Sequence, residues 1–287
     1  MRQFTFGIIL TIAACGPEGS GPIVDGPDGL FMVDGRALAL HCLPGPTPTL
    51  IIDAGLGDSS EDWRAIAVEL STQTSVCTFD RAGYGGSDPG PFPRGPVVNA
   101  QELRALLSVA EIQPPFVLVG HSLGGLNAQA FWARYPSDVA GMILLDPPPR
   151  GFLEGGRFPA LWDLVVAEGE GLQAQADQAR RDSASDAWLM ETMASEHQEM
   201  LRLGAVVADI DSFGDLPLLV VAAGRPNLDY FGESAVAFQV FWIDENRALA
   251  GRSTVGRVEV LDSIGHAMAY EAPSIVLDLI RGFIGGT

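Results

Sequence analysis

The pentapeptide Gly-His-Ser-Leu-Gly at residues 120–124 carries the strongest sign of chemistry in the chain. It follows the apolar run Phe116–Val119 and precedes a segment of helical periodicity that is expected to begin at Gly125. A sharp turn between a buried strand and a helix exposes a serine hydroxyl, and flanking glycines allow the strand and the helix to approach closely. The pattern therefore predicts that Ser122 is a nucleophile.

A serine hydroxyl is a weak nucleophile at neutral pH and needs a general base within hydrogen-bond reach. The chain has four histidines. Three have weaker positions: an early apolar run (His41), the variable position of the pentapeptide (His121) and a polar helical region (His197). His266 follows the last apolar run by a short loop. An imidazole exchanges protons near neutral pH, so a histidine is the natural base. From its place after the last apolar run, we predict that this base is His266.

Composition and charge exclude several classes of function. A chain of 287 residues that is 47% hydrophobic can bury a large core, so it is not expected to be disordered. The formal net charge of −19 repels phosphate backbones, so nucleic-acid binding is not expected. The sequence has no C-x-x-C pair, H-E-x-x-H motif or phosphate loop, so neither a cofactor nor a metal is expected.

The elements that must position Ser122 and His266 alternate between buried strands and helices. Short apolar runs without period-two alternation are typical of strands that are covered on both faces. These runs are Leu50–Ile52, Ser75–Phe79, Phe116–Val119, Met142–Leu145, Leu218–Ala222 and Val258–Leu261. Segments with helical periodicity lie between or after them: Glu61–Ser71, Val97–Ile112, Leu123–Tyr135, Ser234–Ala250 and Pro273–Ile284. The order predicts an α/β fold with a mostly parallel central sheet.

Two segments depart from this alternation. Near the start, Leu30–Val33 and Arg36–Leu43 flank Asp-Gly, which favours a tight hairpin and hence an antiparallel first edge. From about residue 151 to 215 the sequence shows no convincing strand, and helical segments are predicted at Leu161–Ala167, Leu172–Asp182 and Ala187–Leu203. We interpret this region as a helical insertion that covers a site at the sheet's carboxyl edge, as a lid does.

From about Leu30 to its end, the sequence resembles the α/β-hydrolase superfamily. The pentapeptide in its strand–turn–helix setting is similar to that family's nucleophile elbow. Residues 53–57, Asp-Ala-Gly-Leu-Gly, stand where the family usually has His-Gly-x, and residues 80–87 resemble its D-x-x-G-x-G-x-S loop, which is usually structural. The resemblance implies an α/β-hydrolase fold with a helical lid, and backbone amides of Leu56 and Leu123 as the oxyanion hole.

The acid that should orient His266 has two candidates. Family members usually carry it after the strand before last, but Asn227 stands at that position, and an amide cannot stabilise an imidazolium as a carboxylate does. Asp229 lies two residues further on. Asp146 ends the strand Met142–Leu145, where some relatives carry their acid. Asp146 is favoured and Asp229 is kept as the alternative, although an aspartate at a strand end can also simply cap a turn.

Two of the three cysteines fall in strands that the family fold makes neighbours. Cys42 lies in Ala37–Leu43 and Cys77 in Ser75–Phe79. A disulfide between Cys42 and Cys77 is predicted, with two buried thiols as the alternative.

The N-terminal residues are predicted to be a targeting signal. Arg2 precedes the apolar run Phe4–Ile12, which is too short to span a bilayer, and Ile-Ala-Ala-Cys at 12–15 resembles the lipobox of bacterial lipoproteins. Cys15 would then carry the lipid anchor, although an ordinary secretory signal with a chance cysteine is the alternative. Residues 16–29 are rich in Gly, Pro, Ser and Asp, as a flexible tether should be.

These features predict three parts: a lipoprotein signal peptide at 1–15, a tether at 16–29 and a hydrolase domain at 30–287. The protein is expected to be exported and anchored by its N-terminal lipid to a bacterial membrane. Glycine after Cys15, in place of aspartate, favours the outer membrane, facing the periplasm or the cell surface.

Hydrolysis of a carboxylic ester or a related small-molecule acyl substrate, through an acyl-enzyme on Ser122, is the predicted function. Amide, thioester, lactone or carbon–carbon bond hydrolysis would use the same residues. A non-catalytic lipoprotein that binds a ligand or partner with this fold is the alternative from a different class, because the acid is displaced from its usual place.

Overall fold

The structure is a computed structural model that describes residues 27–153, 158–202, 207 and 209–286. The predicted signal peptide, Cys15 and the tether as far as residue 26 lie outside the described residues. The first strand begins at Asp28, two residues before the expected start of the domain.

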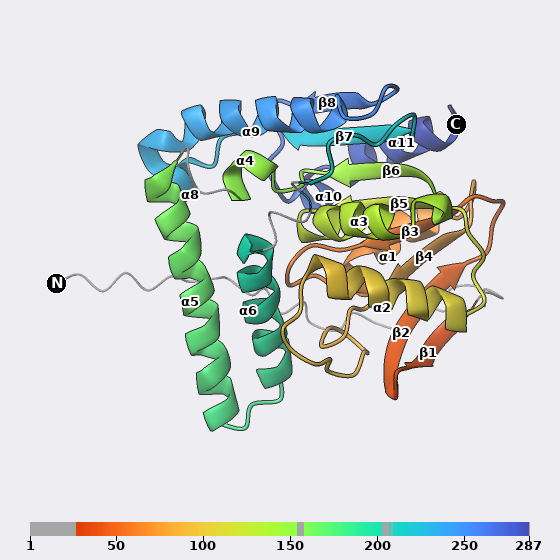
Figure 1. The fold of residues 1–287 in the computed structure, drawn as a ribbon, viewed down its shortest axis with the longest axis horizontal. Coiled ribbons are helices and arrows are strands. Elements are labelled where there is room, and N and C mark those ends of the chain that lie inside the picture. Colours follow the sequence, from red (N-terminus) through yellow and green to blue (C-terminus); the bar gives the residue numbers. More distant parts are fainter. Residues whose placement is uncertain (1–26, 154–157, 203–206, 208, 287) are drawn as a thin grey trace.

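Eight strands form one sheet in the order β1-β2-β4-β3-β5-β6-β7-β8 (Figure 1). Their bounds are β1 Asp28–Val33, β2 Arg36–Leu43, β3 Thr49–Asp53, β4 Val76–Phe79, β5 Phe116–His121, β6 Val139–Leu145, β7 Leu218–Ala223 and β8 Arg257–Leu261. The pairs β1–β2 and β2–β4 are antiparallel, and every other pair is parallel. The mostly parallel sheet with an antiparallel first edge is the fold that the sequence predicts.

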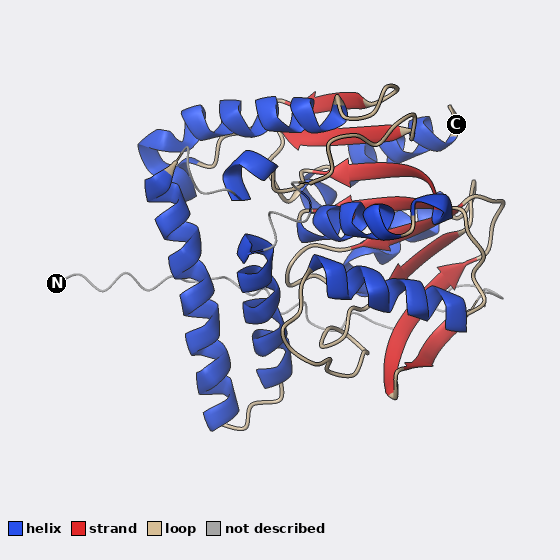
Figure 2. Cartoon of the chain, in the orientation of Figure 1, coloured by secondary structure: helices blue, strands red, loops and turns tan. Residues whose placement is uncertain are grey.

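Helices cover both faces of the sheet (Figure 2). One face packs against α2 (Pro96–Val109), α3 (Leu123–Arg134) and α9 (Ala235–Ala250). The other packs against α1 (Ser60–Leu70), α10 (Met268–Glu271) and α11 (Pro273–Ile284). A one-turn helix, α8 (Leu228–Phe231), precedes α9, and two short 3₁₀ turns lie at Pro136–Asp138 and Gly232–Ser234. Covering on both faces explains why β3 to β7 are almost entirely buried and mostly apolar, and do not alternate.

The insertion between β6 and β7 is mainly helical where it is described. It contains α4 (Arg150–Leu153), α5 (Pro159–Arg181) and α6 (Ala187–Arg202), and α5 and α6 pack side by side (Figure 1). The sequence predicted two helices where the single helix α5 lies. Gly169 lies within α5 and does not interrupt it. Its lack of a side chain lets α6 pack closely, since a Cβ there would lie 2.7 Å from Nδ1 of His197. None of the helices in the described ranges is long and apolar enough to cross a bilayer.

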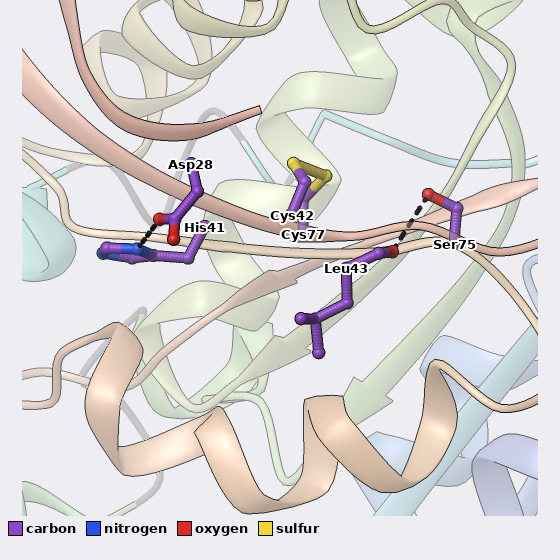
Figure 3. Close-up of a disulfide and its surroundings, with 6 residues drawn as sticks. All are labelled: Asp28, His41, Cys42, Leu43, Ser75 and Cys77. Atoms are coloured by element: carbon purple, nitrogen blue, oxygen red, sulfur yellow. Dashed lines mark hydrogen bonds and ion pairs between the residues drawn. A yellow bond between two sulfur atoms is a disulfide. The ribbon is translucent and has the colours of Figure 1, made fainter. Parts of the chain in front are cut away.

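The antiparallel edge is tied to the parallel sheet by a covalent bond (Figure 3). Cys42 of β2 lies opposite Cys77 of β4, and their sulfur atoms are 2.05 Å apart. His41, the neighbour of Cys42, is exposed and forms an ion pair with Asp28 of β1 at the surface. The Asp34-Gly35 turn of the β1–β2 hairpin has φ values of 48° and 79°, as the type I′ turn favoured by Asp-Gly requires.

Candidate active site

Ser122 is the single residue between β5 and α3. Its φ and ψ are 51° and −118°, and its amide donates to the carbonyl of Leu145 at the end of β6. A positive φ in a non-glycine residue costs on the order of 1–3 kcal/mol and persists only where the surroundings enforce it. The helix begins at Leu123, where the segment of helical periodicity begins and two residues before Gly125, because the strand continues to His121 and the whole change of direction occurs at Ser122.

Two glycines make this turn sterically possible. A Cβ on Gly120 would lie 2.3 Å from the carbonyl oxygen of Gly124. A Cβ on Gly124 would lie 2.1 Å from the carbonyl oxygen of Asp53, so the start of α3 packs directly on the end of β3. The spacing of glycines in the pentapeptide therefore reflects two backbone contacts that exclude any side chain.

His266 connects Ser122 to Asp146. It lies in the loop after β8, with Nε2 2.9 Å from Oγ of Ser122 and Nδ1 2.6 Å from Oδ2 of Asp146. The Asp146 residue directly follows β6 and has a φ of 48°, a second positive value next to the site. Ser122 and Asp146, which lie 144 and 120 positions before His266 in the chain, thus form one line of hydrogen bonds with it.

Asp146 is held on its other oxygen as well. Oδ1 accepts hydrogen bonds from the amide of Ala223 and from Nε1 of Trp242, both at 2.8 Å. The carboxylate is 3% exposed and fully hydrogen-bonded, whereas the His266 side chain is 50% exposed. Trp242 of α9 therefore contacts the acid directly.

The alternative acid, Asp229, lies elsewhere. It is an exposed residue of α8. Asn227, at the family's usual acid position, caps this helix by accepting a hydrogen bond from the amide of Tyr230. The structure thus brings Asp146, and not Asp229, to His266.

The electrostatic surroundings of His266 favour its charged form. Partial burial of the ring lowers the pKa of His266, but the hydrogen bond and charge of Asp146 outweigh it. The carboxylates of Asp58 and Glu271 add to the effect, and the net pKa lies above the ordinary value. An imidazole with a raised pKa accepts a proton more readily, which suits a general base.

His121, set aside in the sequence analysis, contacts the backbone of His266. It is buried, and its Nε2 donates to the carbonyl oxygen of His266 at 2.9 Å. Burial and the neighbouring His266 lower the pKa of His121 to about 4, so its ring is neutral at physiological pH. A single sequence gives no signal for this role, because the contact spans 145 positions.

The two amides predicted for the oxyanion hole belong to the first residue of α3 and to the loop after β3. Leu123 is the first residue of α3, so its amide has no acceptor within the helix. Leu56 lies in the loop after β3, where Gly57 has a φ of 88°. Asp58, at the end of this loop, accepts a hydrogen bond from the hydroxyl of Tyr270 at 3.0 Å, which links the loop to α10 just beyond His266.

The aromatic residues near the insertion mainly pack on one another. Ring contacts join Trp242 to Phe152 and Phe238, and Phe238 to Phe231. Trp188 of α6, by contrast, is 49% exposed, and the guanidinium of Arg180 lies over its ring. Across the described ranges, no cluster of side chains has the composition of a metal site.

Comparison with known protein families identifies the family of this chain. The model of the alpha/beta hydrolase family matches residues 42–279, so the chain is a member of that family. This membership supports hydrolase activity at the level of the superfamily.

One relative and two solved structures show what kinds of protein are similar to this chain. The protein YqjL of Bacillus subtilis is 26% identical over 207 residues, which cover 68% of this chain and 70% of that protein. The enol-lactonase of Burkholderia xenovorans is 17% identical with a TM-score of 0.63 over 89% of this chain and 99% of its own. An esterase of Thermogutta terrifontis is 19% identical with a TM-score of 0.61 over 90% and 97%. The two solved structures establish the shared fold.

Proposed function

We propose that this protein is a serine hydrolase that cleaves a carboxylic ester or a related acyl substrate through an acyl-enzyme. The observation that carries the proposal is the line of hydrogen bonds from Asp146 through His266 to Ser122. Each member has the role that its chemistry suits: the hydroxyl as nucleophile, the imidazole as base and the buried carboxylate as the group that orients and stabilises the imidazolium.

In the acylation half, Oγ of Ser122 attacks the substrate's carbonyl carbon and its proton passes to Nε2 of His266. The carbonyl oxygen becomes an oxyanion, which accepts hydrogen bonds from the amides of Leu56 and Leu123. When the tetrahedral intermediate collapses, the carbon–oxygen bond to the leaving group breaks. The leaving alcohol takes the proton from His266, which regenerates the neutral base.

In the second half, His266 removes a proton from water, and the resulting hydroxide attacks the acyl-serine. A second tetrahedral intermediate forms and collapses, the bond to Ser122 breaks, and Oγ recovers the proton from His266. The products are one carboxylic acid and one alcohol. Lactone, thioester, amide and carbon–carbon substrates differ in the bond that breaks, and the similar proteins with lactonase and esterase names support acyl chemistry only in this general sense.

A binding protein without catalysis remains the contrasting function. Its support in the sequence was the missing carboxylate at position 227. The contact between Asp146 and His266 removes that support, because the histidine has a carboxylate partner from a different strand end.

A fluorophosphonate probe tests the proposal. The full-length protein in mild detergent should be labelled, and Ser122→Ala should lose all labelling, while the matched control Ser234→Ala, at the start of α9, should keep it. A folded parent that is not labelled would refute an activated serine and favour the binding function. A labelled parent justifies a screen of esters of increasing acyl length.

We also propose that the protein is exported and lipid-anchored through Cys15, at the bacterial outer membrane. The lipobox-like sequence at 12–15 supports this, and the disulfide between Cys42 and Cys77 fits an oxidising compartment. Feeding producing cells an alkyne fatty acid should label the parent but not Cys15→Ala. Equal labelling of both, or of neither, contradicts the anchor.

A further inference from the structure

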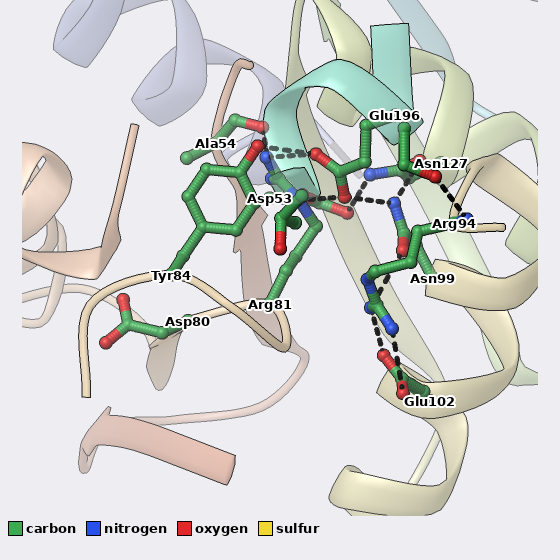
Figure 4. A network of polar contacts seen from close by, with 12 residues as sticks. Asp53, Ala54, Asp80, Arg81, Tyr84, Arg94, Asn99, Glu102, Asn127 and Glu196 are labelled. Atoms are coloured by element: carbon green, nitrogen blue, oxygen red, sulfur yellow. Dashed lines mark hydrogen bonds and ion pairs between the residues drawn. The ribbon is translucent and has the colours of Figure 1, made fainter. Parts of the chain in front are cut away.

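A buried polar network lies beside the proposed oxyanion loop (Figure 4). Its centre is Arg81, in the loop after β4, whose side chain is 2% exposed. A guanidinium has five N–H donors, and Arg81 makes five hydrogen bonds. They reach Oε1 and Oε2 of Glu196, Oδ1 of Asp53, and the carbonyl oxygens of Ala54 and Gly55. Such complete use of the donors fixes both the arginine and its partners.

The bond to Gly55 reaches the peptide group that supplies the oxyanion hole. The carbonyl of Gly55 and the amide of Leu56 belong to one planar peptide unit, in which C=O and N–H point in opposite directions. Nη2 of Arg81 donates to that carbonyl at 2.8 Å, and Nη1 donates to the preceding carbonyl, of Ala54, at 2.7 Å. Holding the oxygen therefore sets the direction of the Leu56 amide, and a cationic donor on the carbonyl also strengthens the amide as a donor.

Glu196 holds Arg81 from the opposite side. It belongs to α6 of the insertion, and its side chain is completely buried. Besides its two bonds from Arg81, it accepts hydrogen bonds from the hydroxyl of Tyr84 at 2.6 Å and from Nδ2 of Asn99 at 2.8 Å. If α6 left this position, it would carry a buried carboxylate away from four donors and would leave the guanidinium short of its main anion.

Asp53 completes the arrangement from the strand side. Its Oδ1 accepts from Arg81 at 2.9 Å and its Oδ2 from Nδ2 of Asn127 at 3.0 Å. Asn127 belongs to α3, the helix that starts at Ser122's turn. The network thus joins the end of β3, α3 and α6 around one cation.

We propose that Arg81 is a positioning residue that orients the Leu56 amide toward the oxyanion, and that Glu196 makes this orientation depend on the docking of α6. This rests on the proposed function, because the hole has a task only if acyl transfer occurs. In this view α6 keeps a fixed position, and that position helps to set the orientation of the Leu56 amide in the site.

The chain contains a matched control for this pair. Arg94 is also wholly buried and also paired with a glutamate, Glu102 of α2. Its side-chain hydrogen bonds go to Glu102 and Asn99, and not to the loop after β3. Arg94 reaches Glu196 only indirectly, through Asn99, so Arg94→Lys perturbs a buried arginine–glutamate pair of the same type and leaves in place the two hydrogen bonds from Arg81 to the carbonyls of Ala54 and Gly55.

The test compares Arg81→Lys and Arg94→Lys with the parent, all as full-length protein, with p-nitrophenyl butyrate as the substrate. Lysine keeps the charge but cannot present the fork of donors. We expect Arg81→Lys to lower kcat about 100-fold with KM within about twofold of the parent, as for a misplaced oxyanion donor. Hydrogen exchange of residues 53–58 should become faster. Arg94→Lys should change neither quantity, even where it lowers Tm as much.

Equal losses of kcat in the two variants, in proportion to their Tm, would show a structural role only and overturn the proposal. If Arg81→Lys does not fold, Glu196→Gln against Glu102→Gln decides the question, since glutamine keeps the shape of the side chain. We expect about a tenfold lower kcat and faster exchange at 53–58 for Glu196→Gln alone, because a weaker clamp loosens the same peptide. An unchanged kcat and exchange rate in folded Glu196→Gln would also overturn it.

Failure of the proposed function has a different signature. A parent that neither hydrolyses the ester nor reacts with the fluorophosphonate contradicts the serine hydrolase. The exchange rate at 53–58 then still reports whether Arg81 and Glu196 hold this loop.

Discussion

The two halves of the sheet serve the site in different ways. In the half formed by β5 to β8, side chains at the carboxyl ends of strands or just beyond them form the proposed triad: Ser122, Asp146 and His266. In the half formed by β1 to β4, the ends of β3 and β4 supply a backbone amide at Leu56 and its support at Arg81. One half therefore presents reacting side chains, and the other holds a peptide group in place.

Exposure does not follow this division, because Asp146, in the same half as His266, is 3% exposed; it separates the proposed base from the residues that position other groups. His266 is half exposed, as a residue must be that exchanges protons with substrate and water, whereas Arg81 and Glu196 are buried and have all their polar atoms occupied. A buried charge without partners is costly, so a completely paired network resists rearrangement. The comparison teaches that access marks the groups that react, and complete hydrogen bonding marks those that position them.

The sharpest way to test the comparison is Asp146→Asn. Asparagine keeps the shape and tolerates the positive φ of 48°, but it cannot stabilise the imidazolium or enforce its tautomer. We expect kcat to fall about 10⁴-fold with little change in Tm. The control Asp229→Asn, on the exposed helix α8, should retain the parent's kcat. A larger loss in Asp229→Asn than in Asp146→Asn would reverse the assignment of the acid.

In the other half, the disulfide should control stability and not chemistry. Cys42 and Cys77 enclose a separation of 35 residues, and a bridge of this size contributes about 3–4 kcal/mol in the chain-entropy treatment. The double variant Cys42→Ala/Cys77→Ala should therefore lose about that much in urea unfolding, while kcat at 25 °C stays within about twofold. A large loss of kcat in a folded double variant would contradict the division between the halves.

Trp242→Phe examines the support of the acid. Phenylalanine keeps the aromatic packing but removes the donor to Oδ1 of Asp146, which retains the amide of Ala223. We expect kcat to fall about tenfold, because a lost hydrogen bond to a charged group costs about 1.5–3 kcal/mol at most. Trp188→Phe, at an exposed position of α6, is the matched control. Equal effects of the two substitutions would assign no special role to Trp242.

The smallest expected effect concerns pH. Because the pKa of His266 is raised above 6.5 and the base must be neutral, kcat/KM should fall as the pH decreases through a value above 6.5. The charge of Asp58 contributes to this rise, so Asp58→Asn should move the acidic limb to lower pH, whereas Asp186→Asn, on the surface between α5 and α6, should not. An acidic limb near pH 4 would indicate that another group controls activity.

Much of the fold could be predicted from the sequence because the strands are covered on both faces. Such strands are mostly apolar runs, and five of them, β3 to β7, are recognisable within three residues of their observed bounds; β8, at the edge of the sheet, was also located although it alternates and is partly exposed. The α5 helix was divided in the prediction, and the gap between the two predicted segments contains Gly169, whose role depends on the packing of His197 from a different helix. Contacts between distant residues were therefore the part that local patterns could not supply.

The candidate site shows the same limit. Ser122 and His266 stand in recognisable local contexts, so they could be singled out without a structure. Asp146 was favoured over Asp229 but Asp229 stayed as an alternative, since both follow a strand and only the three-dimensional arrangement shows which of them meets His266. The role of Arg81 was hidden for the same reason, because its partner Glu196 lies 115 positions away in a region that the sequence presents only as polar helix.

The burial of Glu196 also limits how this protein can be recombined with its relatives. Exchange of the segment between β6 and β7 for another family member's helices is an obvious route to new specificity. Here the graft would remove one of the two buried carboxylates that pair with Arg81 and leave donors of its guanidinium without partners in the core, so a chimaera must bring a carboxylate to the same place or replace Arg81 as well. The insertion and the loop after β4 should therefore be inherited, and engineered, as one unit.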